Sequence, residues 1–300
     1  MPQTSSSTRP IHSTSTSTAA SHADVLSTPA TRERLARIRA ELGSRTHAEA
    51  TLATLSALAP DAENKPRLVE WLREGLAHGD RRFELRTALR ALTKIIEPRS
   101  YLEIGVRRGW SLAQVVSAAP EVRAYGFDAW IENYAGVANP GPSFVRAQLR
   151  EVAPEFRGTL ELFQGNSHDL LPLFFQAVDL DDAELEHLDV VRAGENAPRA
   201  FDLVTVDGDH TALGAWWDLC DVAPFVSLGG ALVFDDLVAF SDETSGGRAV
   251  SRYADGRAAP TDLAHSLRDV WEHFKRGVDN FAFVEDLDAI APIGIAVRMR

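Results

Sequence analysis

The sequence predicts an α/β protein in which a largely parallel, doubly wound sheet follows a cap of helices. Residues 97–300 alternate short β-rich runs with helical stretches, whereas residues 31–96 show helical periodicity alone. Acidic residues also stand at the ends of several expected strands, and a sheet of this kind binds ligands beyond the carboxyl ends of its strands. These acidic residues are therefore the first candidates for a functional site.

Composition limits the kind of protein. The chain of 300 residues is 45% hydrophobic, which is enough for one large core, and its net charge of -12 excludes a surface that attracts a phosphate backbone. We therefore expect no nucleic-acid partner. The longest apolar stretch, residues 222–240, is interrupted by two glycines and two aspartates, so no membrane span is expected. Cys220 is the single cysteine and is expected to be a small buried hydrophobe in a reducing cytoplasm.

The N-terminal residues 1–30 are rich in Ser and Thr and almost free of large apolar side chains. Such a segment cannot offset the entropy cost of ordering, and we expect a disordered tail. It lacks the apolar core of a secretory signal, and Arg9 is its sole Lys or Arg, so it resembles an organelle transit peptide only weakly.

Helical periodicity defines a cap over residues 31–96. The first helix is expected to end at Gly43, and Thr46 is expected to cap the second in a capping box with Glu49. Two more helices are expected, over Pro66–Leu76 and Phe83–Ile96. The cap is either plain scaffold, a wall of the substrate pocket, or a face through which the chain forms a homo-oligomer, and the sequence leaves these alternatives open.

The third region, residues 97–300, contains the expected sheet. Its strands are expected at Ser100–Gly105, Arg123–Asp128, Thr159–Gln164, Phe201–Asp207, Ala231–Asp235, Asn280–Glu285 and Ile293–Met299. Its helices are expected at Ser111–Ala118, Phe144–Val152, Thr211–Val222 and Thr261–Arg276. The acidic stretch Asp179–Glu195 is interpreted as a solvated insertion. The segments Ile131–Ser143 and Leu237–Pro260 are long enough to act as lids.

The first strand leads into a glycine-containing loop. Gly105 and Gly109 allow a tight turn and a close approach to a ligand, and Ser111 is expected to cap the next helix, whose N-terminus favours an anion. The glycine spacing is not that of a dinucleotide site. Glu103, two residues before Gly105, favours a cationic ligand over a pyrophosphate.

Polar residues at the next two strand ends fit a nucleoside. Asp128 could accept both ribose hydroxyls, and Trp130 could cover a base, although a core position is an equally good interpretation of this tryptophan. Asn166 and Ser167, after the third strand, could bind an adenine edge.

These motifs together resemble those of class I S-adenosylmethionine-dependent methyltransferases. The resemblance rests on Glu103-Ile-Gly-Val-Arg-Arg-Gly109, Asp128, Gly165-Asn-Ser167, Val206-Asp-Gly-Asp-His210 and Gly229-Gly-Ala-Leu-Val-Phe-Asp-Asp236. Within this superfamily the chain is similar to the bacterial group with the macrolide-sugar O-methyltransferases and the cephalosporin hydroxylase-like proteins. The resemblance implies a Rossmann-like, seven-stranded sheet with an antiparallel last strand. It places S-adenosylmethionine over residues 103–109, with Asp207 also near the cofactor.

The resemblance also assigns roles to the later acids. It implies that Asp207, Asp235 and Asp236 hold a divalent cation, usually magnesium, and that His210 is the general base. Simpler interpretations stay open: Asp209 could cap the helix from Thr211, and the aspartate pair could be a solvated strand end. The chain also resembles catechol O-methyltransferase more distantly. That group commonly has an amide as the third metal ligand, so Asp236 makes a catechol acceptor less favoured.

The sequence thus predicts a cytoplasmic O-methyltransferase that acts on a hydroxyl group of a sugar or another small natural product. Two alternatives remain. One is a hydroxylase-like enzyme on the same scaffold, and the other is a cofactor-binding module without turnover.

Overall fold

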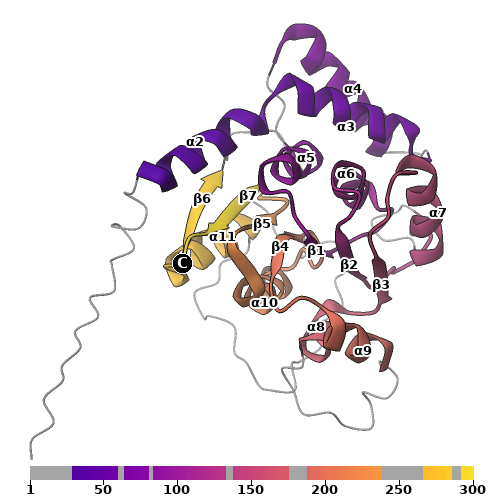
Figure 1. Cartoon of the computed structure of the whole chain (residues 1–300), viewed down its shortest axis with the longest axis vertical. Helices are drawn as coiled ribbons and strands as arrows, with labels where there is room; N and C mark the ends of the chain where they lie inside the picture. The colour runs from indigo at the N-terminus through magenta and orange to yellow at the C-terminus, as the bar shows by residue number, and fades with distance from the viewer. Residues whose placement is uncertain are drawn as a thin grey trace, which may run out of the picture.

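The computed structural model describes residues 29–59, 64–80, 84–132, 138–175, 188–237, 266–285 and 292–300. In this part of the chain, seven strands form one sheet with helices on both faces (Figure 1). The strands are β1 (Ser100–Ile104), β2 (Arg123–Asp128), β3 (Leu160–Gln164), β4 (Phe201–Val206), β5 (Val226–Phe234), β6 (Phe281–Glu285) and β7 (Gly294–Arg298).

The strand order is β3-β2-β1-β4-β5-β7-β6. The first five strands pair in parallel, and β7 runs antiparallel to both of its neighbours, β5 and β6. The predicted doubly wound, mostly parallel sheet with an antiparallel last strand is confirmed. The order reverses between β1 and β4, so the loops after these two strands lie at the switch point where ligands bind in such sheets.

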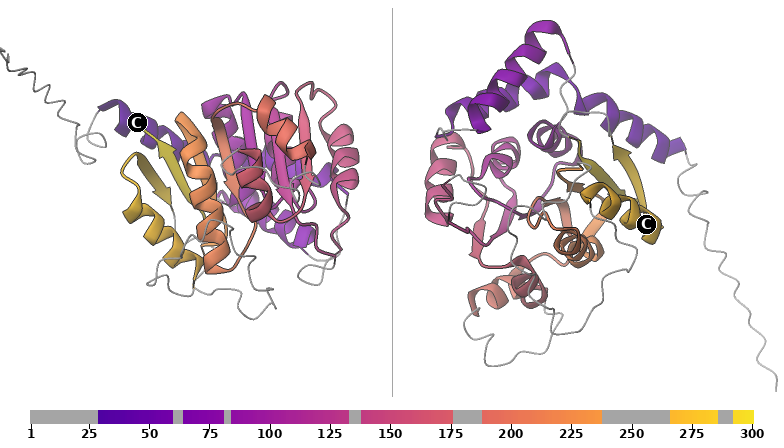
Figure 2. Two further views of the ribbon diagram at one scale, coloured as in Figure 1. Left: turned by 90° about the horizontal axis from the view of Figure 1, so that it is seen from below. Right: turned by 180° about the vertical axis from the view of Figure 1, so that it is seen from behind.

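The helices divide between the two faces (Figure 2). One face packs against α2 (Pro29–Leu42), α3 (Arg45–Ala57), α4 (Asn64–His78), α5 (Leu85–Ile96), α6 (Trp110–Ala118) and α7 (Pro142–Val152). The other face packs against α8 (Ser167–Phe174), α9 (Leu188–Asn196), α10 (Ala212–Val222), the 3-10 helix η3 (Ala223–Phe225) and α11 (Leu267–Gly277). Within the described ranges, no helix is long and apolar enough to cross a membrane.

Alternation along each strand explains the two cores. In β1, Tyr101 points into the core beneath α5 and α6, and Leu102 points into the core beneath α8 and α10. All five residues of β1 are buried, as expected for a central strand covered on both faces. The helices that precede the sheet share the first of these cores, so the expected helical cap packs directly on the sheet.

The predicted capping box of the second helix is wrong. Ser44, not Thr46, caps α3, because its side chain accepts a hydrogen bond from the backbone N–H of His47. Thr46 lies inside the helix, and Glu49 pairs with Arg45 at 2.7 Å instead of closing a capping box.

The prediction of a solvated insertion at Asp179–Glu195 is also wrong for residues 188–195. Residues 188–195 belong to α9, whose Val190 and Val191 are buried in the second core. The short helix α8 was not predicted either. Residues 179–187, the tail of residues 1–28, and residues 133–137 and 238–260 of the two expected lids lie outside the described residues.

Candidate functional site

The carboxyl ends of β4 and β5 bring three aspartates to one edge of the sheet. Asp207 follows β4, and its N–H donates to the carbonyl of Ile104 in β1 at 2.9 Å. Asp235 follows β5, and its N–H donates to the carbonyl of Val206 in β4 at 3.1 Å. These ladder bonds fix both backbones, and Asp236 then turns away with a left-handed φ of 56°. The three acids therefore follow neighbouring strand ends as predicted, and their shared role in holding a cation stays a prediction.

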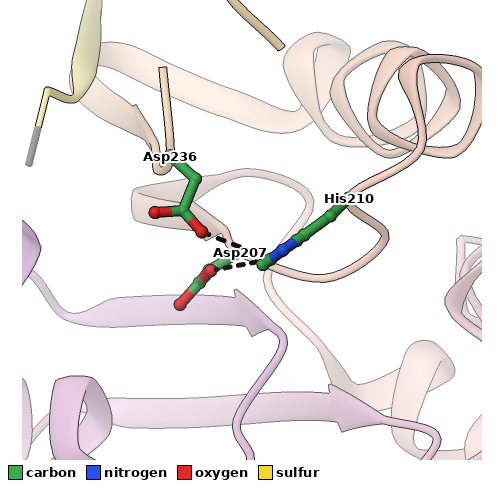
Figure 3. A group of neighbouring side chains, drawn as sticks. All are labelled: Asp207, His210 and Asp236. Atoms are coloured by element: carbon green, nitrogen blue, oxygen red, sulfur yellow. Dashed lines mark ion pairs between the residues drawn. The ribbon is translucent and has the colours of Figure 1, made fainter. Parts of the chain in front are cut away.

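His210 completes the group. Its Nε2 lies 3.4 Å from Oδ1 of Asp207 and 3.6 Å from Oδ2 of Asp236 (Figure 3). The ligand atoms of Asp207, His210 and Asp236 all lie within 4.8 Å of one another. His210 is held there because Thr211 caps α10, accepting a hydrogen bond from the N–H of Gly214 at 3.1 Å. We refer to these three residues as the Asp207–His210–Asp236 cluster.

The charges in this region perturb one another. Burial raises the pKa of Asp235 and Asp236, and the nearby charge of Asp207 raises both further. Burial would lower the pKa of His210, but the hydrogen bond and charge of Asp207, with the charge of Asp236, raise it to about 9. The cluster therefore favours a positive charge between its carboxylates.

Asp235 is not one of the three residues of the cluster, and its carboxylate faces Arg86 of α5. It is 6% exposed, and its Oδ2 is 4.0 Å from Nη1 of Arg86, which also donates to Glu84 at 3.2 Å. Burial would lower the pKa of Arg86, but the charges of Glu84 and Asp235 raise it. Sequence reasoning did not identify Arg86. The role of Asp235 as a metal ligand stays a prediction.

Glu103 supports the glycine loop from inside the protein. Its side chain has no exposed surface, and it accepts hydrogen bonds from Tyr101 at 2.8 Å and from Ser111. Burial raises its pKa to about 8, although both hydrogen bonds lower it. The prediction that Ser111 caps α6 is wrong, because Gly109 is the N-cap residue and the Ser111 hydroxyl bonds Glu103 instead.

The two loop glycines serve packing. A Cβ on Gly105 would lie 1.8 Å from the carbonyl oxygen of Asp207, and one on Gly109 would lie 2.8 Å from Cγ1 of Val145. Both have φ values near +80° (+87° and +77°), which favour glycine. Gly105 thus lets the end of β1 approach the residue that carries the first carboxylate of the cluster.

Asp128 ties two loops together. Its carboxylate accepts from the N–H of Arg107 at 2.6 Å and from the N–H of Trp130. Burial raises its pKa, although these two hydrogen bonds lower it. Trp130 is 5% exposed and its Nε1 donates to the carbonyl of Arg107 at 2.9 Å, so the core interpretation of this residue is the one that the structure favours.

The polar residues after β3 are engaged within the protein. Asn166 caps α8 by accepting from the N–H of His168 at 3.1 Å, and the hydroxyl of Ser167 donates to Asp218 at 2.8 Å. Asp209 does not cap α10 itself. It accepts from the N–H of Thr211, the true cap residue, at 2.8 Å. Contact of Asn166 or Ser167 with an adenine stays a prediction.

Comparison with known families gives one match within the chain. Residues 102–237 match the family described as "Methyltransferase domain". This range begins in β1 and ends just after Asp236, so it includes the glycine loop and the Asp207–His210–Asp236 cluster. No curated protein matches the chain.

Several solved structures are similar to the chain. They include the O-methyltransferase TomG from Streptomyces achromogenes, involved in tomaymycin synthesis, with 17% identity over 71% of this chain and 78% of that one and a TM-score of 0.43. An O-methyltransferase from Bacillus cereus has 12% identity over 85% and 91% of the two chains and a TM-score of 0.45. The mycinamycin-pathway methyltransferase MycE, solved with Mg, has 17% identity over 67% and 44% and a TM-score of 0.40.

Proposed function

Residues 102–237 are a methyltransferase domain, and on this premise we propose that the protein is an O-methyltransferase that uses S-adenosylmethionine and a divalent cation. The acceptor that we propose is a hydroxyl group of a small molecule, such as a sugar or another natural product. The observation that carries the proposal is the Asp207–His210–Asp236 cluster, which gathers two carboxylates and an imidazole at the switch point of the sheet.

A divalent cation fits this group of side chains. Asp207, Asp235 and Asp236 offer the carboxylate oxygens that magnesium prefers, and burial together with the charge of Asp207 raises the pKa of the last two, so a cation beside them would be stabilising. The cation would be held by these aspartates, with the ring nitrogen of His210 adjacent. When bound, it would lower the pKa of an acceptor hydroxyl and fix its oxygen.

The side chain of His210 would take the proton that the reaction releases. As a bond forms between the acceptor oxygen and the methyl carbon, the bond from that carbon to the cofactor's sulfur breaks and the hydroxyl proton must leave. Because the carboxylates of Asp207 and Asp236 raise its pKa to about 9, His210 would accept this proton only after a bound cation had taken the place of its own positive charge between them.

The cofactor would lie over the loop from Gly105 to Gly109, at the N-terminus of α6. S-adenosylmethionine supplies the methyl group. Asp128 fixes the backbone of this loop through the N–H of Arg107 and retains lone pairs that can accept ribose hydroxyls. Glu103 would support the cofactor loop by accepting hydrogen bonds from Tyr101 and Ser111, rather than by contact with a ligand.

The test is methyl transfer from S-adenosylmethionine to a panel of hydroxylated small molecules, followed by mass spectrometry with and without a chelator. Asp207→Asn should abolish turnover and the response to magnesium, because it removes a charged ligand from a hard cation. Asp279→Asn is the matched control, since this aspartate pairs with Arg300 on the surface. His210→Ala should lower the rate by about two to four powers of ten while magnesium still binds.

Two results would contradict the proposal. If a chelator leaves wild-type activity unchanged, the carboxylates do not serve a cation. If tight S-adenosylmethionine binding occurs with no methylated product from any acceptor, the chain is a cofactor-binding module.

A further inference from the structure

A second charged group, His168 with Asp209 and Asp218, involves the segment that carries Asp207 and His210, and the proposed chemistry does not use it. His168, near the start of α8, is 3% exposed and lies between two aspartates. Its Nδ1 is 3.3 Å from Oδ1 of Asp218, and its Nε2 is 3.5 Å from Oδ2 of Asp209. Trp217 covers the imidazole edge-on, with ring centroids 5.6 Å apart.

Both ring nitrogens of His168 face a carboxylate oxygen. A neutral imidazole has one N–H donor and one acceptor, so one nitrogen would then point a lone pair at a negative oxygen. A protonated ring donates from both. Asp218 is fully buried and needs a compensating charge, since a lone carboxylate in the interior is costly. Burial would lower the pKa of His168, but the charge of Asp218 and the hydrogen bond to Asp209 raise it, which agrees with the geometry.

His168 and its two aspartates form hydrogen bonds that hold residues 207–211, the segment that carries Asp207 and His210. Asp218 accepts from the N–H of Asp209 at 3.4 Å, and Asp209 accepts from the N–H of Thr211 at 2.8 Å. Asp209 stands between Asp207 and His210 in the sequence. The packing is tight on the same side, because a Cβ on Gly208 would lie 3.0 Å from Oδ2 of Asp218.

We propose that His168 is a positioning residue for the methyl-transfer site. Held between Asp209 and Asp218, its ring anchors residues 208–211 to α8 and α10, and so fixes the directions in which Asp207 and His210 leave this segment. The catalytic part of this inference rests on the proposed function. The anchoring itself does not.

Hydrogen exchange tests the anchoring without substrate or cofactor. In His168→Gln, amide exchange in a peptide covering residues 207–212 should become at least several-fold faster. His168 would no longer hold in place the carboxylates that accept hydrogen bonds from the amides of Asp209 and Thr211. His47→Gln is the matched control, because His47 is also largely buried and bonds a carboxylate, Glu41, at 3.0 Å but lies in α3. Unchanged exchange at residues 207–212 in His168→Gln overturns the inference.

Kinetics then test the positioning. With an acceptor found by the screen above, His168→Gln should lower kcat by roughly ten- to hundred-fold, the scale of a small misplacement of reacting groups, with little change in KM for S-adenosylmethionine. His47→Gln should leave both unchanged. An equal loss of kcat in the two variants would mean a general effect on stability and would overturn the inference.

A double-mutant comparison of His168 and Asp209 distinguishes a positioning role from a simple loss of packing. If His168 acts through Asp209, then Asp209→Asn should add little to the loss of kcat already present in His168→Gln, whereas independent effects would multiply. Should His168→Gln fail to fold, Asp218→Asn perturbs the same group with its shape retained, and the same exchange increase is expected. Failure of wild-type methyl transfer would refute the proposed function alone, since the exchange result would still decide the anchoring.

Discussion

Replacement of Gly105 by alanine should damage the site through the backbone of its neighbour. Gly105 has a φ of +87°, and a Cβ built there would lie 1.8 Å from the carbonyl oxygen and 2.4 Å from the carbonyl carbon of Asp207. Two ladder bonds hold the chains at this point, from Gly105 N–H to Phe127 and from Asp207 N–H to Ile104, both at 2.9 Å. The clash can be relieved only if β1 and β4 move apart at their carboxyl ends.

The expected cost has two parts. A left-handed conformation costs an alanine about 1–2 kcal/mol relative to glycine. Forcing extra volume into a packed interior adds about 1–3 kcal/mol, and here the obstacle is backbone, which cannot change rotamer. We therefore expect Gly105→Ala to lower the free energy of unfolding by about 2–5 kcal/mol. Gly79→Ala isolates the first part, because Gly79 has a φ of +75° and a methyl group there would meet no atom within 4 Å.

Urea denaturation of both variants, followed by circular dichroism, measures the difference. Gly79→Ala should lose only about 1–2 kcal/mol, and Gly105→Ala should lose clearly more. Magnesium binding by calorimetry should also weaken in Gly105→Ala, because Asp207 moves with the strand end. Equal losses of stability in the two variants would refute the close approach of Gly105 to Asp207.

Two further predictions concern the other acids of the site. Asp128→Ala should weaken S-adenosylmethionine binding by about 1–3 kcal/mol in calorimetry, the scale of lost charge-assisted hydrogen bonds; full affinity would remove this aspartate from the cofactor site. Glu103 has a folded-state pKa of about 8, above its ordinary value of 4.5, so the folded state binds the extra proton and wild-type stability falls as pH rises between these values. In Glu103→Gln, the free energy of unfolding measured by urea denaturation should differ less between pH 5 and pH 8 than in the wild type. An equal difference in the two proteins would contradict this prediction.

The sequence allowed the sheet to be predicted because its strands are short apolar runs between turn residues. Strand β2 was expected at Arg123–Asp128 and is found there, and the other six differ from their expected bounds by a few residues at one or both ends. The convergence of Asp207, Asp235 and Asp236 followed from the rule that parallel strands deliver their carboxyl ends to one edge.

What the sequence could not supply was the partner of each polar side chain. Ser111 stands in the first turn of α6 and has the composition of a cap, yet its hydroxyl bonds Glu103, which lies on a different element. Trp130 could cover a ligand or fill a core, and only the packed structure shows it buried. His168 carried no local pattern at all, since both of its aspartates come from other elements.

The position of Arg86 links the N-terminal helices to the acids of the site. Glu84 and Thr87 form a capping box that fixes where α5 begins, and the buried Leu85 and Leu89 seat the helix in the core of the sheet. Arg86, in the first turn between these anchors, is thereby aimed at the buried Asp235. A carboxylate buried beside Asp207 and Asp236 needs that positive charge. Helix α5 is therefore part of the electrostatics of the site, and a chain that lacked it would leave Asp235 without its guanidinium.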